Sequence, residues 1–207
     1  MQKILLIGAG ALARDMITSF GIGRFCAAYV DPAYAPDEPP YGIKLVSDWR
    51  EAAREATHFV LAIADMAQRA RMVSQATEAG LQAADALIVE DARLASDVII
   101  GKGSVVGHFA AVGPGARLME HVLVMHGCTV GHDTQLAANV VLCSGVRTGG
   151  YSAVGRDCFI GPNAVVSPHV KVGAQCHVAA GAVCFRNVPD ERIAIGNPAR
   201  LSTAWPA

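Results

Sequence analysis

The sequence predicts a chain of two parts, a small α/β unit followed by a parallel β-helix. Two observations lead to this expectation. Residues 1 to about 88 alternate short apolar runs with helical stretches, and from about residue 94 onward an aliphatic side chain recurs at every sixth position. We therefore expect an N-terminal domain over residues 1–88, a β-helix over 89–190 and a C-terminal tail over 191–207.

The composition suits many short strands and tight turns. Of 207 residues, 52% are hydrophobic, 17% are charged and 21 are glycine, which is enough apolar material for a sizeable core. The formal net charge of −1, without a basic block, argues against nucleic-acid binding. No apolar run approaches the about 18 residues of a membrane span, and the N-terminus lacks a signal-peptide pattern. We expect a cytoplasmic protein.

The first part alternates expected strands and helices. The strands are expected at Lys3–Ile7, Cys26–Val30, Phe59–Ile63 and Ala83–Val89, and the helices at Ala11–Phe20 and about Met66–Ala79. Gly80 stands where a helix C-cap is expected. Alternating strands and helices predict a small parallel sheet covered by helices, in a Rossmann-like arrangement.

The second part has a period of six residues. From Leu94 to Cys184 every sixth residue is a large aliphatic at fourteen of sixteen positions, Thr148 and Cys184 being the exceptions, and the residue four places later is always small or β-branched. A helix would need a period of 3.6 and a strand a period of 2. Both sets are expected to point inward. Glycine fills half of the positions after the large aliphatic, where we expect it to supply the turn conformation.

The six cysteines also fit this pattern. None of them forms a C-x-x-C pair, which weakens both the zinc and the redox interpretation. We expect reduced cysteines that act as small core residues, and no metal site.

These features resemble the hexapeptide-repeat sugar acetyltransferases, in particular the sialic acid O-acetyltransferases and nucleotide-sugar N-acetyltransferases. The resemblance covers nearly the whole chain. It rests on Ile7-Gly8-Ala9-Gly10, Val30-Asp31, Ala62-Ile63-Ala64-Asp65, His126 to Asp133 and Gly196-Asn197-Pro198-Ala199-Arg200. The resemblance implies a left-handed β-helix with three hexapeptides per triangular coil, so that residues eighteen apart stack. It also implies a homotrimer with acetyl-CoA, the acetyl donor, between neighbouring β-helices.

The same resemblance implies the catalytic residues. His132 matches the general base of the family, a role suited to an imidazole because its unperturbed pKa is about 6.5. Asp133 matches the acidic residue that orients the base. Gly150 stacks one coil beyond His132, where its backbone N–H would contact the acetyl carbonyl. Pro162 and Ala180 match the CoA contacts of the family in position rather than in residue type.

The glycine-rich start of the chain resembles the nucleotide-sugar site of the family. Backbone N–H groups after the first strand and a carboxylate after the second can hold a pyrophosphate and a ribose or base. The expected contacts are Gly10, Ala11, Leu12, Asp31 and Ala64. The third glycine of the dinucleotide fingerprint is Ala13, which disfavours redox use of NAD. Pro32 replaces a second acid, so the nucleotide, and whether the site is used at all, stay open.

The sequence leaves four possible functions open. The first is N-acetylation of an amino-dideoxy nucleotide-sugar, and the second is O-acetylation of sialic acid or another sugar. A metalloenzyme similar to the γ-carbonic anhydrases would need converging histidines, for which His108, His121 and His126 are available. A non-catalytic scaffold is the last. The roles of His108 and His126 stay open, with His126 most simply a turn residue stacked beside His108.

Overall fold

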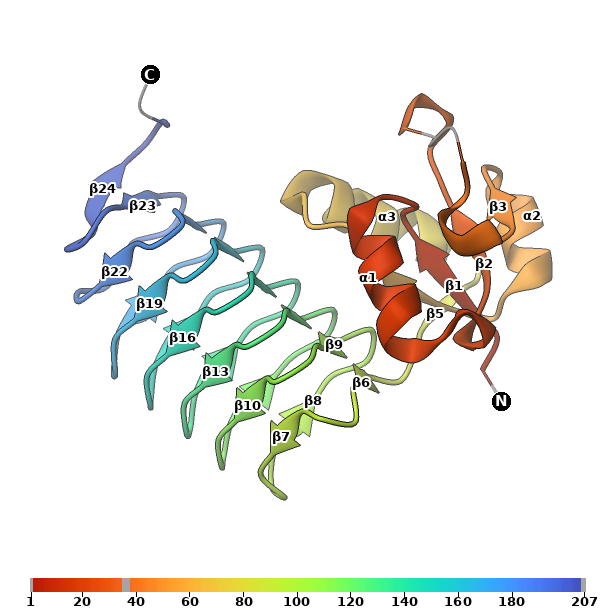
Figure 1. Ribbon diagram of the computed structural model, residues 1–207. Helices are drawn as coiled ribbons and strands as arrows, with labels where there is room; N and C mark the ends of the chain where they lie inside the picture. The colour runs from red at the N-terminus through yellow and green to blue at the C-terminus, as the bar shows by residue number, and fades with distance from the viewer. Residues whose placement is uncertain (1, 35–37, 206–207) are drawn as a thin grey trace. The chain divides into compact units, whose positions relative to one another are not determined.

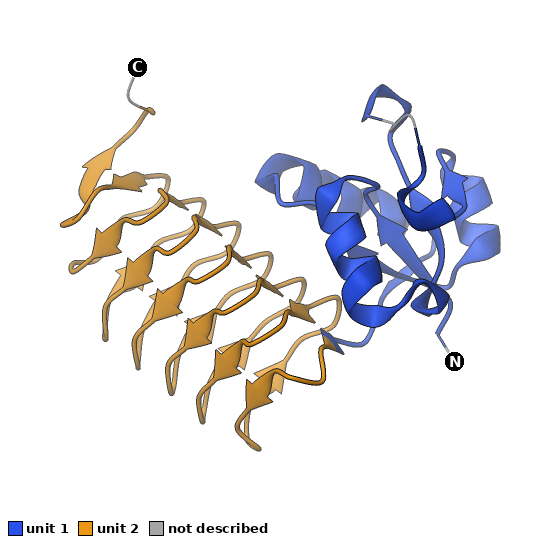
Figure 2. Ribbon diagram, in the orientation of Figure 1, with its two compact units in different colours: residues 1–87 blue, residues 88–207 orange. Residues whose placement is uncertain are grey.

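The computed structural model describes residues 2–34 and 38–205. The chain divides into two compact units, Met1–Leu87 and Ile88–Ala207 (Figure 2). None of the helices in the described ranges has the length and hydrophobicity needed to cross a membrane.

The first unit is built on a five-stranded parallel sheet with the order β3-β2-β1-β4-β5 (Figure 1). The strands are β1 (Ile4–Ile7), β2 (Phe25–Tyr29), β3 (Leu45–Val46), β4 (His58–Leu61) and β5 (Gln82–Ala83). The helices are α1 (Ala11–Phe20), α2 (Trp49–Glu55) and α3 (Met66–Glu78), with short 3-10 turns at Ile22–Arg24, Pro32–Tyr34 and Pro40–Gly42. Because the strands are parallel, their carboxyl ends lie at one edge of the sheet. The strand order reverses between β1 and β4, and open α/β sheets bind ligands at this edge where the order reverses.

The helices of this unit begin and end as their sequences dictate. The helix α1 has the predicted bounds, and α3 ends at Glu78. Gly80 then adopts φ +87° and donates its N–H to the Thr77 carbonyl at 2.9 Å, as expected of a C-terminal glycine. The helix α2 was not predicted, because its sequence is mostly charged. The Asp48 carboxylate caps it by accepting the Arg50 and Glu51 N–H groups.

One strand prediction is wrong. The expected strand Ala83–Val89 divides into two short strands in different sheets, with Ala84, Asp85 and Ala86 between them. The first piece, β5, pairs with β4. The second, β6 (Leu87–Ile88), lies at the end of a β-helix sheet beside β9. The prediction therefore placed strand residues at Ala83 and at Leu87–Ile88 but missed the break and the change of unit between them.

The second unit is the parallel β-helix (Figure 1). Its short strands fall into three sheets, which are parallel except for the last strand, β24. The first sheet contains β7 (Arg93–Leu94), β10 (Ala111–Val112), β13 (Thr129–Val130), β16 (Arg147–Thr148), β19 (Val165–Val166) and β22 (Val183–Cys184). The second contains β8 (Ile99–Ile100), β11 (Arg117–Leu118), β14 (Gln135–Leu136), β17 (Ala153–Val154) and β20 (Lys171–Val172). The third contains β6, β9 (Val105–Val106), β12 (Leu123–Val124), β15 (Val141–Leu142), β18 (Phe159–Ile160), β21 (His177–Val178), β23 (Ile193–Ile195) and β24 (Arg200–Ser202).

Residues eighteen apart pair in these sheets, as the sequence predicts. Thr129 pairs with Arg147 in the first sheet and Gln135 with Ala153 in the second. Three hexapeptides therefore complete one coil. The strands follow one another every six residues up to Cys184, so no long loop leaves the coil.

The inward-pointing residues form one continuous core. The large aliphatic positions from Val106 to Cys184 and the small positions from Ser104 to Val188 are buried, which confirms the inward prediction. Small polar members bond to the backbone of a neighbouring coil: the Ser104 hydroxyl donates to the Met119 carbonyl at 2.9 Å, and the Cys158 thiol to the Gly173 carbonyl at 2.9 Å. Burial raises the pKa of Cys158 to about 12 and of Cys128 to about 11, so these thiols are protonated near neutral pH.

The glycines after the large aliphatic have a different role from the one expected. None of the eight has a positive φ, so they do not supply an unusual turn conformation. They allow close approach instead, because a Cβ at Gly131 would lie 2.6 Å from Gly150 N and one at Gly155 would lie 2.6 Å from Ala174 N. The left-handed turn position comes two residues later. It is filled by glycine at five turns and mostly by polar residues at the others, such as Asp133 with φ +55°.

The coil continues past the expected end of the β-helix at residue 190. The strand β23 pairs in parallel with β21, and β24 pairs antiparallel with β23. Residues 191–202 of the expected tail therefore extend the third sheet, and residues 206 and 207 lie outside the described part of the chain.

The close approach of coils predicts which of two matched glycine substitutions lowers the free energy of unfolding more. Gly155→Asn should lower the free energy of unfolding by about 3 kcal/mol, because its side chain would overlap the next coil. Gly127→Asn should cost less than about 1 kcal/mol, because asparagine tolerates a left-handed turn and nothing lies within 4 Å of a Cβ there. Urea denaturation of both variants measures the difference. Equal losses of stability would show that coil spacing does not limit the side chain at Gly155.

Candidate active site

His132 and Asp133 lie at the corner between the first and second sheets of the β-helix. The strand β13 ends before Gly131, so the two side chains project from the turn, and both are about half exposed at 53% and 45%. His132 Nδ1 lies 2.9 Å from Asp133 Oδ2. Because an ionised carboxylate only accepts hydrogen bonds, a neutral His132 carries its proton on Nδ1 and leaves Nε2 with a free lone pair.

Gly150 lies directly against the His132 ring. A Cβ at Gly150 would collide with Nε2 and would lie 2.6 Å from Cε1. The absence of a side chain at Gly150 therefore makes room for the imidazole, with its Nε2 edge over the Gly150 backbone. In the described part of the chain the Gly150 N–H has no hydrogen-bond acceptor.

A second corner, between the third and first sheets, carries the column that begins at His108. The rings of His108 and His126 stack with centroids 5.7 Å apart. The column continues through Ser144, Pro162 and Ala180, with Asn163 N–H donating to the Ser144 carbonyl and Gly181 N–H to the Pro162 carbonyl. Ser144 is half-buried, and Pro162 and Ala180 are exposed. Small side chains thus follow the two histidines along this corner.

The three histidines considered for a metal do not converge within the chain. His108 Nδ1 lies 3.0 Å from both carboxylate oxygens of Asp91, and His126 stacks on His108. His121 lies on the third corner, between the second and third sheets. Within residues 2–34 and 38–205, no group of three or more possible ligands forms.

The first unit has its own pocket, of about 210 Å³, at the carboxyl ends of β1, β2 and β4. It is lined by Ile7, Gly8, Ala9, Gly10, Tyr29, Val30, Asp31, Tyr34, Ala62, Ile63, Gln68, Arg71 and Met72. Gly8 has φ +114°, and a Cβ there would lie 2.6 Å from the Ala62 carbonyl oxygen, so both the turn and the close packing of β1 on β4 need glycine.

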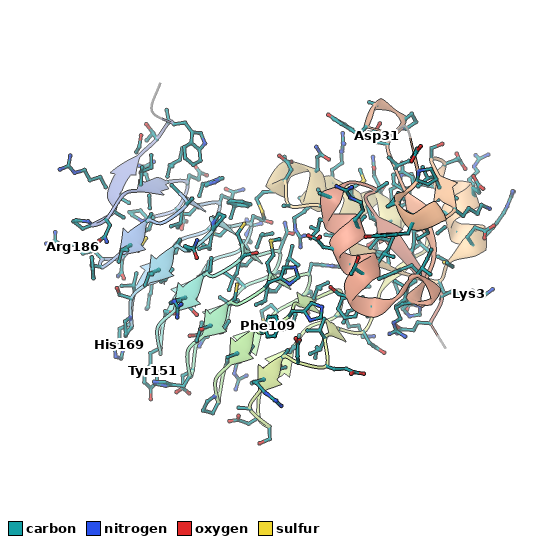
Figure 3. All side chains as sticks on the ribbon, in the orientation of Figure 1. Lys3, Asp31, Phe109, Tyr151, His169 and Arg186 are labelled. Carbon is teal, nitrogen blue, oxygen red and sulfur yellow. The ribbon has the colours of Figure 1, made fainter. Side chains whose placement is uncertain are left out.

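Charged groups meet at the mouth of this pocket. Asp31, at the end of β2 (Figure 3), lies 3.6 Å from an Arg71 nitrogen of α3. Its other oxygen accepts the Ala33 N–H at 3.0 Å, which fixes the carboxylate at the turn. Arg69, two residues before Arg71, is buried and donates to the Ile63 carbonyl at 2.7 Å, holding the turn between β4 and α3. Burial lowers the pKa of Arg69 to about 10, so it keeps its charge.

The chain is similar to known hexapeptide-repeat transferases in sequence and in structure. Residues 151–186 match the family model described as bacterial transferase hexapeptide (six repeats). No curated protein sequence matches the chain. A mutant of perosamine N-acetyltransferase from Caulobacter crescentus, in complex with CoA and GDP-perosamine, has 26% identity and a TM-score of 0.89, covering 98% of this chain and 97% of that one.

Two further structures are similar over their whole length. The acetyltransferase domain of PglB from Neisseria gonorrhoeae, in complex with acetyl coenzyme A, has 26% identity and a TM-score of 0.85, covering 97% of this chain and 99% of that one. WeeI from Acinetobacter baumannii has 22% identity and a TM-score of 0.83, covering 98% and 100%, and shows the fold alone. These similarities show that the protein is an acyltransferase. The resemblance to sugar acetyltransferases is confirmed, and the relatives contain CoA or acetyl-CoA as expected.

The structure gathers the predicted site residues of this acyltransferase into three places. His132, Asp133 and Gly150 meet at one corner. Pro162 and Ala180 lie on another, with the first sheet between the two corners. Gly10 and Asp31 line the pocket of the first unit, whereas Ala11, Leu12 and Ala64 are not among its lining residues.

Sequence reasoning missed several residues around these sites. Tyr151 and His169 lie beside His132 on the same corner, and Arg71 faces Asp31. The eighteen-residue stacking could have indicated Tyr151 and His169, because both follow the column of His132 by one residue. Arg71 gave no such signal, since its contact with Asp31 depends on how α3 packs on the sheet.

Proposed function

We propose that this protein transfers the acetyl group of acetyl-CoA to the amino group of an amino-dideoxy nucleotide-sugar. The observation that carries the proposal is the His132 imidazole, bonded to Asp133 through Nδ1 and packed with its Nε2 edge over Gly150. The full-length similarity to an N-acetyltransferase bound to CoA and GDP-perosamine supports the acceptor class.

His132 acts as the general base. Its Nε2 accepts the proton that the acceptor amine loses as the nitrogen attacks the thioester carbonyl carbon. When the carbon–sulfur bond breaks, the same proton passes to the CoA sulfur, so the imidazole ends neutral. Asp133 holds the tautomer that leaves Nε2 free and stabilises the imidazolium that forms between these two steps.

Gly150 stabilises the negative charge that develops on the carbonyl oxygen. Its N–H has no acceptor among the described residues and lies one coil beyond the base. A preorganised donor of this kind contributes roughly 3 kcal/mol to lowering the barrier in other acyl-transfer enzymes.

The acetyl donor fits the second corner. Ser144, Pro162 and Ala180 present small side chains along three successive coils, which suits an extended pantetheine arm. Because the first sheet separates this corner from His132 within one chain, we propose a homotrimer in which the donor lies between His132 of one subunit and this corner of its neighbour. Acetyl-CoA supplies the activated acetyl group there.

The pocket of the first unit holds the nucleotide of the acceptor. The N-terminus of α1 presents backbone N–H groups suited to a phosphate. Asp31 is placed to accept hydrogen bonds from a ribose or base, and Arg71 supplies a positive charge beside it. The order of the sheet, which reverses between β1 and β4, supports a Rossmann-like nucleotide-binding unit.

A panel of acceptors tests the reaction and its base together. CoA release from acetyl-CoA is measured with GDP-perosamine, other amino nucleotide-sugars and free sialic acid. We expect turnover with an amino nucleotide-sugar and a loss of at least about 100-fold in kcat in His132→Ala, because the amine then loses its base. His58→Ala, a histidine of the first unit that does not line its pocket, is the control and should keep wild-type kcat.

Turnover with sialic acid as the only accepted sugar would contradict the proposed N-acetylation and favour O-acetylation. Unchanged kcat in His132→Ala would remove this histidine from the mechanism while leaving the acetyltransferase activity in place.

Nucleotide binding is tested separately by calorimetry with GDP, UDP and dTDP. We expect one nucleotide to bind the wild type, and Asp31→Ala to weaken it about 10-fold, as for the loss of a hydrogen bond to a charged group. Asp15→Ala, an exposed acid of α1 outside the pocket, should bind as the wild type does. Absence of binding for all three nucleotides would assign the first unit a structural role.

A further inference from the structure

The contact between His132 and Asp133 is by itself a weak restraint on the imidazole. It is a single hydrogen bond of 2.9 Å between side chains that are about half exposed, so water competes for both partners. A base that must meet its substrate in one orientation therefore needs packing around the ring in addition to this bond.

Tyr151 provides such packing. Its ring stands perpendicular to the His132 imidazole, at 90° with centroids 5.0 Å apart. The two residues are also joined through their backbones, because the Tyr151 N–H donates to the His132 carbonyl at 2.9 Å. The two residues are thus held together both by their backbones and by the contact between their rings.

The turn itself does not call for a tyrosine. Tyr151 has φ +57°, a left-handed conformation that glycine and asparagine adopt more easily than aromatic residues do. The same position in the preceding coils of this corner is Gly115 and Asp133. Tyr151 is 54% exposed, so core packing does not explain it either.

His169 holds the tyrosine from the other side. The rings of Tyr151 and His169 stack at 10° with centroids 5.1 Å apart. His169 N–H donates to the Gly150 carbonyl at 3.0 Å, which ties this turn to the glycine beneath the imidazole. Figure 3 shows Tyr151 and His169 along the same corner of the β-helix.

We infer that Tyr151 is a positioning residue for the acetyl transfer, and that His169 braces it. Tyr151 keeps the His132 ring from rotating, so that Nε2 stays on the Gly150 side, where the oxyanion donor lies. The inference rests on the proposed function of His132. Tyr151 is not assigned any proton transfer or substrate contact.

The experiment uses three variants of the full chain. Tyr151→Asn removes the ring and suits the left-handed backbone, Tyr151→Phe keeps the ring, and Tyr41→Asn is the matched control. Tyr41 has φ +51° and is 62% exposed, but it lies in the first unit and does not line the pocket there. Two readouts are taken: kcat and KM for acetyl-CoA with the best acceptor of the panel, and the imidazole nitrogen signals of His132 by NMR.

We expect Tyr151→Asn to lower kcat by about 10–100-fold, the scale of a misplaced catalytic group, with KM for acetyl-CoA within about twofold. Its imidazole signals should change from one tautomer to an exchanging mixture. Tyr151→Phe should keep the wild-type kcat and a single His132 tautomer, and so should Tyr41→Asn.

Wild-type kcat together with a single His132 tautomer in Tyr151→Asn would overturn the inference. A Tyr151→Phe variant as impaired as Tyr151→Asn would also overturn it, since the hydroxyl would then be the active part. If His132→Ala keeps its activity, the proposed base is wrong, and the NMR signals, which need no turnover, still decide whether Tyr151 positions the ring.

Discussion

The close approach of successive coils in the β-helix is the constraint on which the rest of the structure depends. The strands of the β-helix up to β22 are two residues long, so a coil gains stability almost only from hydrogen bonding and packing against the next coil. At several turns a Cβ on the residue after the large aliphatic would point into the next coil, so the backbones there can stack at about 4.8 Å only if that residue is glycine. Glycine after the large aliphatic residue meets this need, as the 2.6 Å contact of a Cβ at Gly155 shows.

The corner that carries His132 is a special case of this constraint. At Gly150 the space that a side chain would fill is taken by the His132 imidazole from the preceding coil. The stacking that builds the fold thus also places the His132 imidazole against the Gly150 backbone. A candidate site of this kind needs no loop to assemble it, because the register of the strands brings residues eighteen apart together.

The regular parts of the structure could be predicted from the sequence, and the irregular contacts could not. The six-residue period determines which side chains enter the core and which coil each residue belongs to, so His132 and Gly150 were placed together correctly. The short strand β3 and the charged helix α2 carry little hydrophobic pattern and were missed. The role of the glycines was misjudged, because the sequence does not distinguish a need for positive φ from a need for space. Arg71 and the rings of Tyr151 and His169 depend on side-chain packing, which no period encodes.

The most direct test of the central claim is the pH dependence of the single-turnover rate of acetyl transfer, measured for the wild type and for His132→Ala. The acceptor amine must be unprotonated in both enzymes, so both should lose rate in acid. We expect a steeper loss of rate in acid for the wild type, because a protonated imidazole cannot accept the proton of the amine. Profiles of the same shape in the two enzymes would contradict the assignment of His132 as the base.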